Sequence, residues 1–282
     1  MAVVAVVLLL ALLPVFRAGG RDAADGPRLT VATWNMCGVL DWGCAEFGDG
    51  AAKTSALVGL VHGRGARVVL LQEACAGDVE AARQALGATA WQLAFQPYEQ
   101  VGADGRRSPV ACGGGAERGD AGFGILANAE LSGQVVVPAA QPTSGLQRGV
   151  LCATAGADLR VCAAHLSLPP SDRSRRDLEF RDDQLAALLT AAGDGPAVFG
   201  GDFNASPPKP GNKDAWIWPA AYFDRVQECD QQHPAQPGGR ATHDNGLKLD
   251  YLFTALPRHG CRLADTGVSD HRALVLEVSA AL

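Results

Sequence analysis

Polar side chains stand where several apolar runs of the chain end, and their types suit a divalent cation. The full set is Asn35, Glu73, His165, Asp202, Asn204, Asp250, Asp270 and His271. Carboxylate and amide oxygens are ligands that Mg²⁺ prefers, with Mn²⁺ or Ca²⁺ as alternatives. No zinc-type cysteine or histidine spacing and no serine or cysteine nucleophile motif is present. Such an ion keeps positions for water and phosphate oxygens, which indicates phosphoryl chemistry.

The stretch VFGGDFNASP, residues 198 to 207, places a carboxylate and an amide at the end of an apolar run. In extended backbone, side chains at positions i and i+2 leave on the same face. We therefore expect Asp202 and Asn204 to point together, while Phe203 points the other way.

Asp250 lies within the apolar segment LKLDYLF, so its carboxylate must be paired if it is buried. The natural partner is an imidazole, because a carboxylate that holds one N–H of a histidine fixes the tautomer of the ring. Other members of the set have plainer explanations when taken singly. Glu73 could begin a helix, and His165 could be a hydrogen-bonded core histidine.

The elements that must position these residues are mostly strands. Strands are predicted at Leu29–Asn35, Arg67–Gln72, Trp91–Gln96, Gly122–Leu126, Gln134–Val137, Gly149–Ala153, Arg160–Ala164, Ala197–Gly201, Lys248–Thr254 and Ala273–Val278. Helices are predicted at Ala51–His62, Asp78–Leu86 and Ser171–Ala192. Many strands without regular alternation with helices favour a mostly antiparallel α+β domain. No linker divides the chain after residue 28, so residues 28–282 are predicted to form one domain.

The chain begins with an apolar run, MAVVAVVLLLALLPVF, that is slightly short for a membrane span. Residues 1–27 are therefore predicted to be a signal peptide, or an N-terminal membrane anchor, with a short linker. In either case the folded part faces away from the cytoplasm, as a secreted or membrane-anchored extracellular protein.

The 8 cysteines agree with an oxidising compartment. The segment GVLCATAGADLRVCAAHL reads as a hairpin that sets Cys152 opposite Cys162. Cys37 and Cys44 are close enough in sequence for a short-loop bridge. The remaining pairing stays open, and the alternative is that all the cysteines are buried thiols.

The formal net charge of −6 argues against a basic face that holds long stretches of nucleic acid. Arginines gather only at positions 173, 175, 176 and 181, where acidic residues are interleaved with them. We expect that segment to be a solvated helix face. No obligate protein partner is evident, and a monomer is expected.

Taken together, the motifs resemble the endonuclease/exonuclease/phosphatase superfamily. The blocks that carry the resemblance are LTVATWNMCG, VVLLQEA, CAAHLS, VFGGDFNASP, KLDYLFT and VSDHRALVLEV, which occur in the order and rough spacing of that superfamily. Its members include deoxyribonucleases, abasic-site endonucleases, neutral sphingomyelinases and inositol-polyphosphate phosphatases. The resemblance spans about residue 28 to the C-terminus and implies a four-layered α/β/β/α sandwich with the site at one end.

The resemblance also implies roles for the polar set. Asn35 and Glu73 resemble the metal site, with Asp270 close by. Asp202 and Asn204 resemble the pair that positions the attacking water and the phosphate. The remaining members are a carboxylate–imidazole couple and a second histidine that donates to the leaving group or binds a phosphate oxygen, namely Asp250, His271 and His165. The general base stays open between Asp202 and the couple.

The sequence departs from several relatives around GFGILAN, where an expected tyrosine or arginine for the phosphate is missing. Phosphate recognition is therefore assigned to Asn128, Arg148 or a loop arginine. His243 is an additional histidine, expected to be structural or to lie at the rim of the site.

These observations predict a secreted hydrolase of phosphodiester bonds that needs Mg²⁺, or else Mn²⁺ or Ca²⁺, and acts by in-line attack of an activated water. Its partner is a phosphoester substrate, which could be nucleic acid, a phospholipid or a small phosphoester. The alternatives are a phosphatase, a sphingomyelinase-like phospholipase C, and, from another class, a catalytically silent extracellular binding module.

Overall fold

The computed structural model describes residues 26–170, 178–233 and 236–282. The apolar leader lies outside the described residues, as do the arginines at positions 173, 175 and 176. Within the described part of the chain, no helix has both the length and the apolar character needed to cross a membrane.

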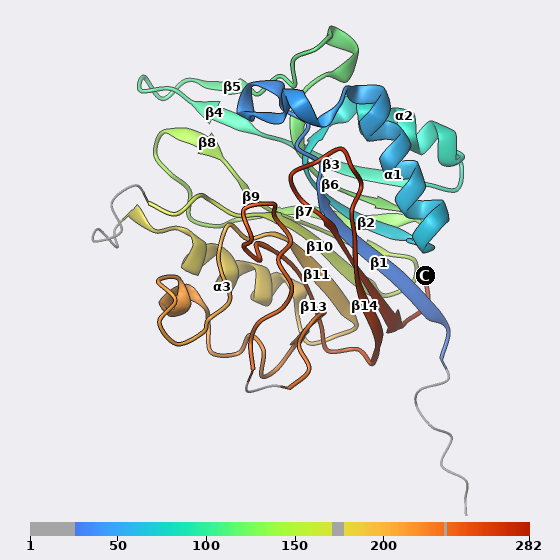
Figure 1. Ribbon diagram of the computed structural model, residues 1–282, viewed down its shortest axis with the longest axis vertical. Helices are drawn as coiled ribbons and strands as arrows, with labels where there is room; N and C mark the ends of the chain where they lie inside the picture. The colour runs from blue at the N-terminus through green and yellow to red at the C-terminus, as the bar shows by residue number, and fades with distance from the viewer. Residues whose placement is uncertain (1–25, 171–177, 234–235) are drawn as a thin grey trace, which may run out of the picture.

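One six-stranded sheet has the strand order β14-β15-β1-β2-β6-β3. Its strands are β1 (Arg28–Asn35), β2 (Val68–Cys75), β3 (Gln92–Pro97), β6 (Ala121–Ala127), β14 (Arg258–Ala264) and β15 (Ala273–Ser279). Helices α1 (Gly50–Arg64) and α2 (Ala76–Leu86) cover its outer face, as Figure 1 shows. Buried Leu57 and Val79 of these helices pack with Trp34 of β1.

The second six-stranded sheet has the order β12-β13-β11-β10-β9-β7. Its strands are β7 (Leu131–Val137), β9 (Gly149–Ala155), β10 (Leu159–His165), β11 (Ala197–Asp202), β12 (Gln227–Glu228) and β13 (Asp250–Thr254). Helix α3 (Arg181–Ala192) packs on its outer face through Leu185 and Leu188, together with Phe199 of β11. A small third sheet joins β4 (Glu99–Val101), β5 (Arg107–Pro109) and β8 (Gly145–Gln147).

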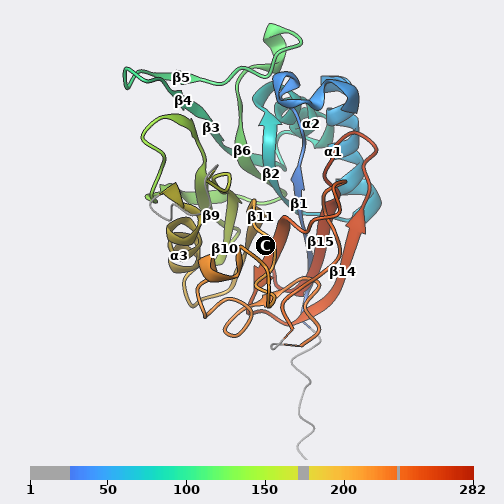
Figure 2. The same ribbon diagram turned by 60° about the vertical axis from the view of Figure 1, so that its left-hand side comes forward.

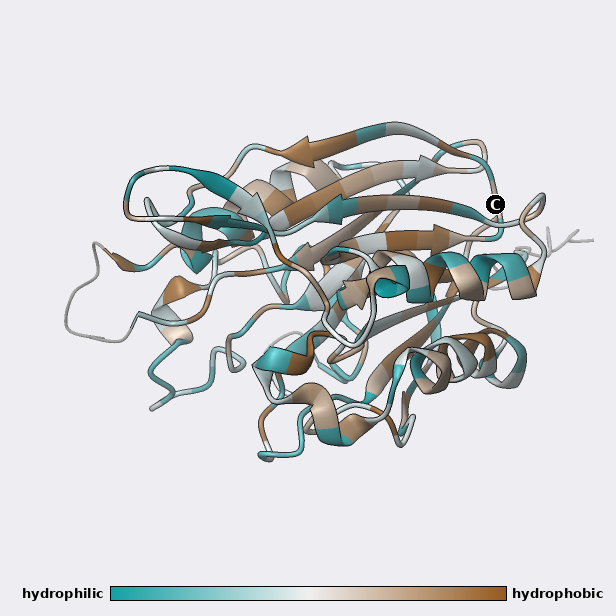
Figure 3. Ribbon diagram, turned by 90° about the horizontal axis from the view of Figure 1, so that it is seen from above, coloured by the Kyte–Doolittle hydropathy of each residue, from teal (hydrophilic) through white to brown (hydrophobic). Residues whose placement is uncertain are grey.

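The two large sheets pack face to face, as the turned view in Figure 2 shows. Val31 and Leu70 from the first sheet and Val161 and Leu252 from the second belong to one buried apolar cluster. Much of the hydrophobic colour in Figure 3 runs along the strands that enclose this core. The predicted α/β/β/α sandwich of two mostly antiparallel sheets is therefore confirmed.

All the predicted strands form, with ends within a few residues of those expected. The predicted helix 171–192 is present as α3 from Arg181 to Ala192, but Glu179 and Phe180 are not helical, and residues 171–177 lie outside the described part. Arg181 is also not on a solvated face. Its side chain is buried, where it forms ion pairs with Glu179 and Asp214.

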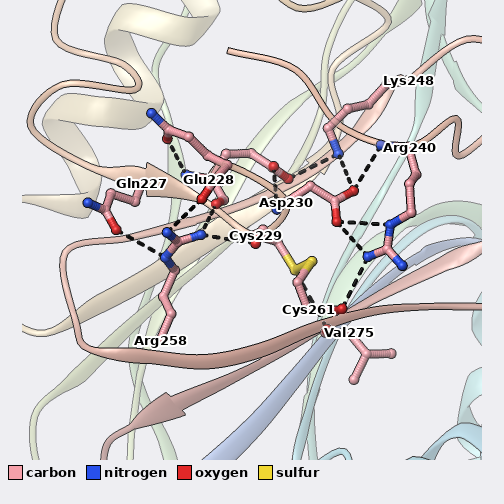
Figure 4. The surroundings of a disulfide bond; sticks show 10 residues. Gln227, Glu228, Cys229, Asp230, Arg240, Lys248, Arg258, Cys261 and Val275 are labelled. Atoms are coloured by element: carbon pink, nitrogen blue, oxygen red, sulfur yellow. Dashed lines mark hydrogen bonds and ion pairs between the residues drawn. A yellow bond between two sulfur atoms is a disulfide. The ribbon is translucent and has the colours of Figure 1, made fainter. Parts of the chain in front are cut away.

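Every cysteine is in a disulfide, so the free-thiol alternative is wrong. The predicted bridges Cys37–Cys44 and Cys152–Cys162 are present, and the second joins residues that face each other in the β9–β10 ladder. The other two bridges are Cys75–Cys112 and Cys229–Cys261. Figure 4 shows the Cys229–Cys261 bridge beside the buried ion pair of Lys248 and Glu228.

Strand direction brings the polar set to one end of the sandwich. The parallel pair β1–β2 sets Asn35 beside Gln72, next to Glu73. The parallel pair β10–β11 sets His165 beside Asp202, and antiparallel β13 begins at Asp250 opposite Asp202. Carboxyl ends of parallel strands share an edge, whereas an antiparallel neighbour begins there.

Candidate active site

A pocket of about 890 Å³ opens at this end of the two sheets. Its walls include five members of the polar set predicted from the sequence: Glu73, Asp202, Asn204, Asp270 and His271. The other three members, Asn35, His165 and Asp250, are fully buried behind these residues, each at most 1% exposed. The structure therefore brings the whole predicted set to one place.

Asp202 follows two glycines in strand β11. The neighbouring strands leave no room for a side chain at either glycine. A Cβ at Gly200 would lie 1.9 Å from the carbonyl oxygen of Tyr251, and one at Gly201 would lie 1.8 Å from that of Ala164. Strands β10 and β13 thus hold β11 closely on both sides. This close packing fixes the backbone that leads into Asp202, and hydrogen bonds from Asn35 and Asn204 hold its carboxylate.

Asn204 lines the pocket, but its backbone is not extended as expected. Strand β11 ends at Asp202, and Asn204 has a φ of 49°, so the two residues do not share an extended strand. Instead, the backbone N–H of Asn204 donates to Oδ1 of Asp202 at 2.9 Å, and its side-chain amide donates to the carbonyl of Leu166. Phe203 points into the outer core, as predicted, where it stacks on Tyr251.

Asp250 and His271 form the expected carboxylate–imidazole couple. Nδ1 of His271 lies 2.8 Å from Oδ2 of Asp250, and its Nε2 lies 3.9 Å from Oδ2 of Asp202. Burial alone would lower the pKa of His271, but Asp250 and Asp202 outweigh it and raise that pKa to about 10. The imidazole is therefore a cation at neutral pH.

Asn35 and Ser269 tie the first strand to the rest of the site. The Asn35 amide donates to Oδ2 of Asp202 at 3.1 Å, and its Oδ1 accepts the backbone N–H of Cys37. The Ser269 hydroxyl donates to the backbone carbonyl of Asn35 at 2.8 Å and accepts a hydrogen bond from the backbone N–H of His271. These bonds connect strands from both sheets across the site.

Glu73 sits on a β-bulge between β2 and β6, with a φ of 47°. Its carboxylate is 15% exposed, and its Oε2 lies 3.9 Å from Sγ of Cys44. Burial, together with the nearby Asp202, raises the pKa of Glu73 to about 7. Burial also raises the pKa of Asp202, to about 6.

These shifts test whether a divalent cation fits the site. The pKa values of Glu73 and Asp202 are raised toward neutral mainly because both carboxylates are buried, and a neighbouring carboxylate adds to each shift. Oδ1 of Asp250, among the described residues, is buried without a hydrogen-bond partner. The donor set is carboxylate and amide oxygen, which suits Mg²⁺, Mn²⁺ or Ca²⁺. The residues present fit such an ion.

His165 is held between a tyrosine and an arginine. Its Nδ1 lies 2.5 Å from the hydroxyl oxygen of Tyr98, and Nε of Arg148 donates to its Nε2 at 3.1 Å. Burial lowers the pKa of His165 well below its ordinary value, and Arg148 lowers it further. The guanidinium of Arg148 also lies 5.8 Å from the centre of the Trp42 ring.

Of the residues considered for the phosphate, Arg148 lies in the pocket and Asn128 does not. Asn128 follows β6 at the opposite end of the sheet, where its side chain bonds Arg67 and the carbonyl of Ala90. His243 lines the pocket rim, with Nε2 3.6 Å from Oδ2 of Asp270. Nothing in the sequence indicated that Tyr98 belongs to the site, because it lies between two strands and is part of no recognised motif.

Comparison with known proteins agrees with this geometry. Residues 32–271 match the model of the Endonuclease/Exonuclease/phosphatase family. The chain belongs to this family. Members of the endonuclease/exonuclease/phosphatase family are metal-dependent phosphoester hydrolases, so the prediction of such an enzyme is confirmed at the level of the family. A sequence search among curated proteins found no match.

Solved structures share the fold of the family. An endonuclease/exonuclease/phosphatase protein from Beutenbergia cavernae has a TM-score of 0.64 at 20% identity, over 89% of this chain and 71% of that one. A humanized D. rerio TDP2 has a TM-score of 0.61 at 18% identity, over 90% and 99% of the two chains. The human Nocturnin catalytic domain has a TM-score of 0.58 at 16% identity, over 89% and 93%.

Proposed function

We propose that the chain hydrolyses phosphodiester bonds, in the manner of a nuclease, by in-line attack of an activated water. The observation that carries this proposal is the His271 imidazole, held by Asp250 beside Asp202 in the pocket that also contains Glu73 and Arg148. Mg²⁺ is the proposed cation, with Mn²⁺ or Ca²⁺ as alternatives.

Glu73, Asn35 and Asp270 are proposed to hold the cation, which when bound neutralises phosphate charge and stabilises the leaving oxygen. Asn35 offers a second lone pair on Oδ1 beyond the one that accepts the Cys37 N–H. Asp202 is kept in place by hydrogen bonds from Asn35 and Asn204, so its carboxylate can orient a water and take its proton.

Arg148 and His271 are the cationic groups that would contact the phosphate. Both line the pocket, and a guanidinium suits the oxygen pair of a phosphate. The pocket is otherwise rich in carboxylates, so a phosphodiester with one negative charge is repelled less than a monoester with nearly two. This balance supports a diesterase over a monoester phosphatase.

Two observations bear on substrate and compartment. A structure of D. rerio TDP2 contains a single strand DNA product, which favours nucleic acid among the candidate phosphodiesters. Leu168 and Leu247 at the pocket are 56% and 46% exposed, which favours the alternative of an amphiphilic phospholipid. The four disulfides support a secreted or otherwise extracellular protein.

The decisive experiment is an assay of the purified protein against plasmid DNA, RNA, sphingomyelin, bis(p-nitrophenyl) phosphate and p-nitrophenyl phosphate. Each is measured with Mg²⁺, Mn²⁺, Ca²⁺ or a chelator. We expect diester hydrolysis that the chelator abolishes, and its loss in Asp202→Ala and His271→Ala with unchanged folding. Unchanged turnover in either variant contradicts the proposal.

Calorimetric titration with Mg²⁺ separates an inactive enzyme preparation from a silent binding module. Binding that disappears in Glu73→Gln supports the proposed cation site. A folded protein that neither binds the ion nor hydrolyses any of the substrates would be the silent module, and the proposed function would be wrong.

A further inference from the structure

Tyr98 lies between β3 and β4, behind the wall of the pocket, with no exposed surface. Its ring packs 5.7 Å from each of the rings of Trp42 and Phe123, and its edge meets His165. Its backbone N–H donates to the carbonyl of Ala121 at 2.8 Å. The hydroxyl oxygen is therefore held in one place by both ring and backbone.

Two polar groups converge on this oxygen. The backbone N–H of Glu73 donates to it at 3.0 Å, and Nδ1 of His165 lies 2.5 Å away. A tyrosine hydroxyl can accept and donate, so these distances alone do not say where the proton of the imidazole is.

The other ring nitrogen of His165 decides the position of that proton. Nε of Arg148 lies 3.1 Å from Nε2, and a guanidinium can only donate hydrogen bonds. Nε2 therefore accepts this bond; the nearest carboxylate oxygen, Oδ2 of Asp202, is 3.6 Å away, beyond hydrogen-bond distance. In a neutral imidazole the single proton is then on Nδ1, and it is donated to the oxygen of Tyr98.

We propose that Tyr98 is a positioning residue that fixes His165 in the Nδ1–H tautomer and directs the lone pair of Nε2 toward Arg148 in the wall of the pocket. His165 in the resting site then accepts a hydrogen bond or a proton, and does not donate one. This deepens the proposed function, on which its catalytic consequence rests, and it reverses the donor role that the sequence suggested for His165.

The bond from Glu73 offers a competing role for Tyr98. Glu73 sits on a bulge at positive φ, and the described structure gives its N–H no other acceptor than the Tyr98 oxygen. Loss of the hydroxyl could therefore disturb the carboxylate rather than the imidazole. The tests below separate these two routes.

The first test reads the tautomer directly from nitrogen NMR of the histidine rings in the metal-free protein. The chain has 6 histidines and 3 tyrosines, so assignment is practical with His165→Gln. We expect His165 to carry its proton on Nδ1. We expect Tyr98→Phe to move protonation toward Nε2, since the buried Nδ1–H loses its acceptor. A proton on Nε2 in the wild-type protein overturns the proposal.

Tyr222→Phe is the matched control, because Tyr222 is also buried and its hydroxyl donates to the carbonyl of Leu185, under α3. It should leave the His165 signals unchanged. A change as large as that in Tyr98→Phe would assign the effect to a general loss of packing and overturn the proposal.

The second test is a double-mutant cycle on diester hydrolysis. Tyr98→Phe should lower kcat about 10- to 100-fold, as loss of an orienting partner commonly does. In a His165→Gln background the same change should alter kcat by less than about twofold. A full effect in that background shows that Tyr98 acts through Glu73 and contradicts the proposal. A wild-type protein without activity contradicts the proposed function instead, and the NMR result still decides the tautomer.

Discussion

Nδ1 of His271 lies 2.8 Å from Oδ2 of Asp250, and neither side chain is more than 6% exposed. Because both side chains are buried, the carboxylate stabilises the protonated imidazole and fixes which nitrogen faces Asp202 and the pocket. The couple therefore supplies a positive charge at the proposed phosphate site.

Replacing the carboxylate of Asp250 should remove most of the activity without changing the shape of the site. Asp250→Asn keeps the side-chain volume but no longer stabilises the imidazolium, so we expect kcat to fall by about 10²- to 10⁴-fold. The measurement is diester hydrolysis with saturating Mg²⁺, and thermal unfolding checks the fold. Asp158→Asn, on the exposed turn between β9 and β10, is the control and should retain full activity.

The metal-free protein should lose stability as the pH rises. Burial raises the pKa of Glu73 from 4.5 to about 7 and that of Asp202 from 3.8 to about 6. Between about pH 4 and pH 7 the folded chain thus binds more protons than the unfolded chain, so the free energy of unfolding falls with rising pH. The contribution is complete below the unfolded pKa values and is lost above the folded ones. For Glu73 alone it is roughly 3 kcal/mol.

Urea denaturation in the presence of a chelator, at pH 5 and at pH 8, measures this effect. Glu73→Gln should flatten the dependence, and Mg²⁺ should restore stability at pH 8 because it binds the deprotonated carboxylates. Equal or greater stability of the wild-type protein at pH 8 without metal would show that burial does not raise the pKa values of Glu73 and Asp202 as described.

The outline of the fold could be predicted because most strands are buried on both faces. Continuous apolar runs such as those of β2 and β11 mark strands without any need for alternation. Strand β14 was not predicted, since its sequence, RHGCRLA, is mixed in polarity and lies half-exposed at the edge of its sheet. The three-residue strands β4, β5 and β8 carry too few residues for any pattern.

The site could be predicted in part because polar residues at strand ends interrupt apolar runs. Asp202 and His165 could be recognised in this way. Tyr98 does not, because its contact with His165 joins residues 67 apart in sequence and depends on how two sheets face each other. The expectation that Arg181 is exposed was wrong for a related reason. A run of charged residues indicates solvent exposure only when none of them forms a buried ion pair with another segment, as Arg181 does with Asp214.

The Cys37–Cys44 bridge should matter to the site, whereas Cys152–Cys162 should matter only to stability. The two bridges close loops of 7 and 10 residues, so removing either should cost a similar 2–3 kcal/mol or so. Only Cys44 lines the pocket, beside Glu73. Cys37→Ser with Cys44→Ser should therefore weaken Mg²⁺ binding in calorimetry, and Cys152→Ala with Cys162→Ala should not. Equal Mg²⁺ affinity in both double variants would refute the distinction.

Arg181 should be among the most costly single residues to remove. Its guanidinium bonds Glu179 at 2.7 Å, Asp214 at 3.1 Å and the carbonyl of Asn204 at 2.5 Å. Arg181→Ala leaves the carboxylate of Glu179 buried without its partner, which costs about 3–5 kcal/mol. The same change removes the hydrogen bond from Arg181 to the backbone carbonyl of Asn204. That bond holds the turn that carries Asn204, so kcat should fall as well.

The matched control for this change is Arg225→Ala. Arg225 pairs with Asp194 at 2.7 Å, but the two side chains are 51% and 89% exposed, so the pair contributes at most about 1 kcal/mol. Adding Glu179→Gln to Arg181→Ala should recover part of the lost stability, because the uncompensated charge is then gone, yet it should not restore kcat, since the Asn204 carbonyl still lacks its donor. Recovery of kcat together with stability would show that Arg181 supports the fold alone and does not hold the turn that brings Asn204 to the pocket.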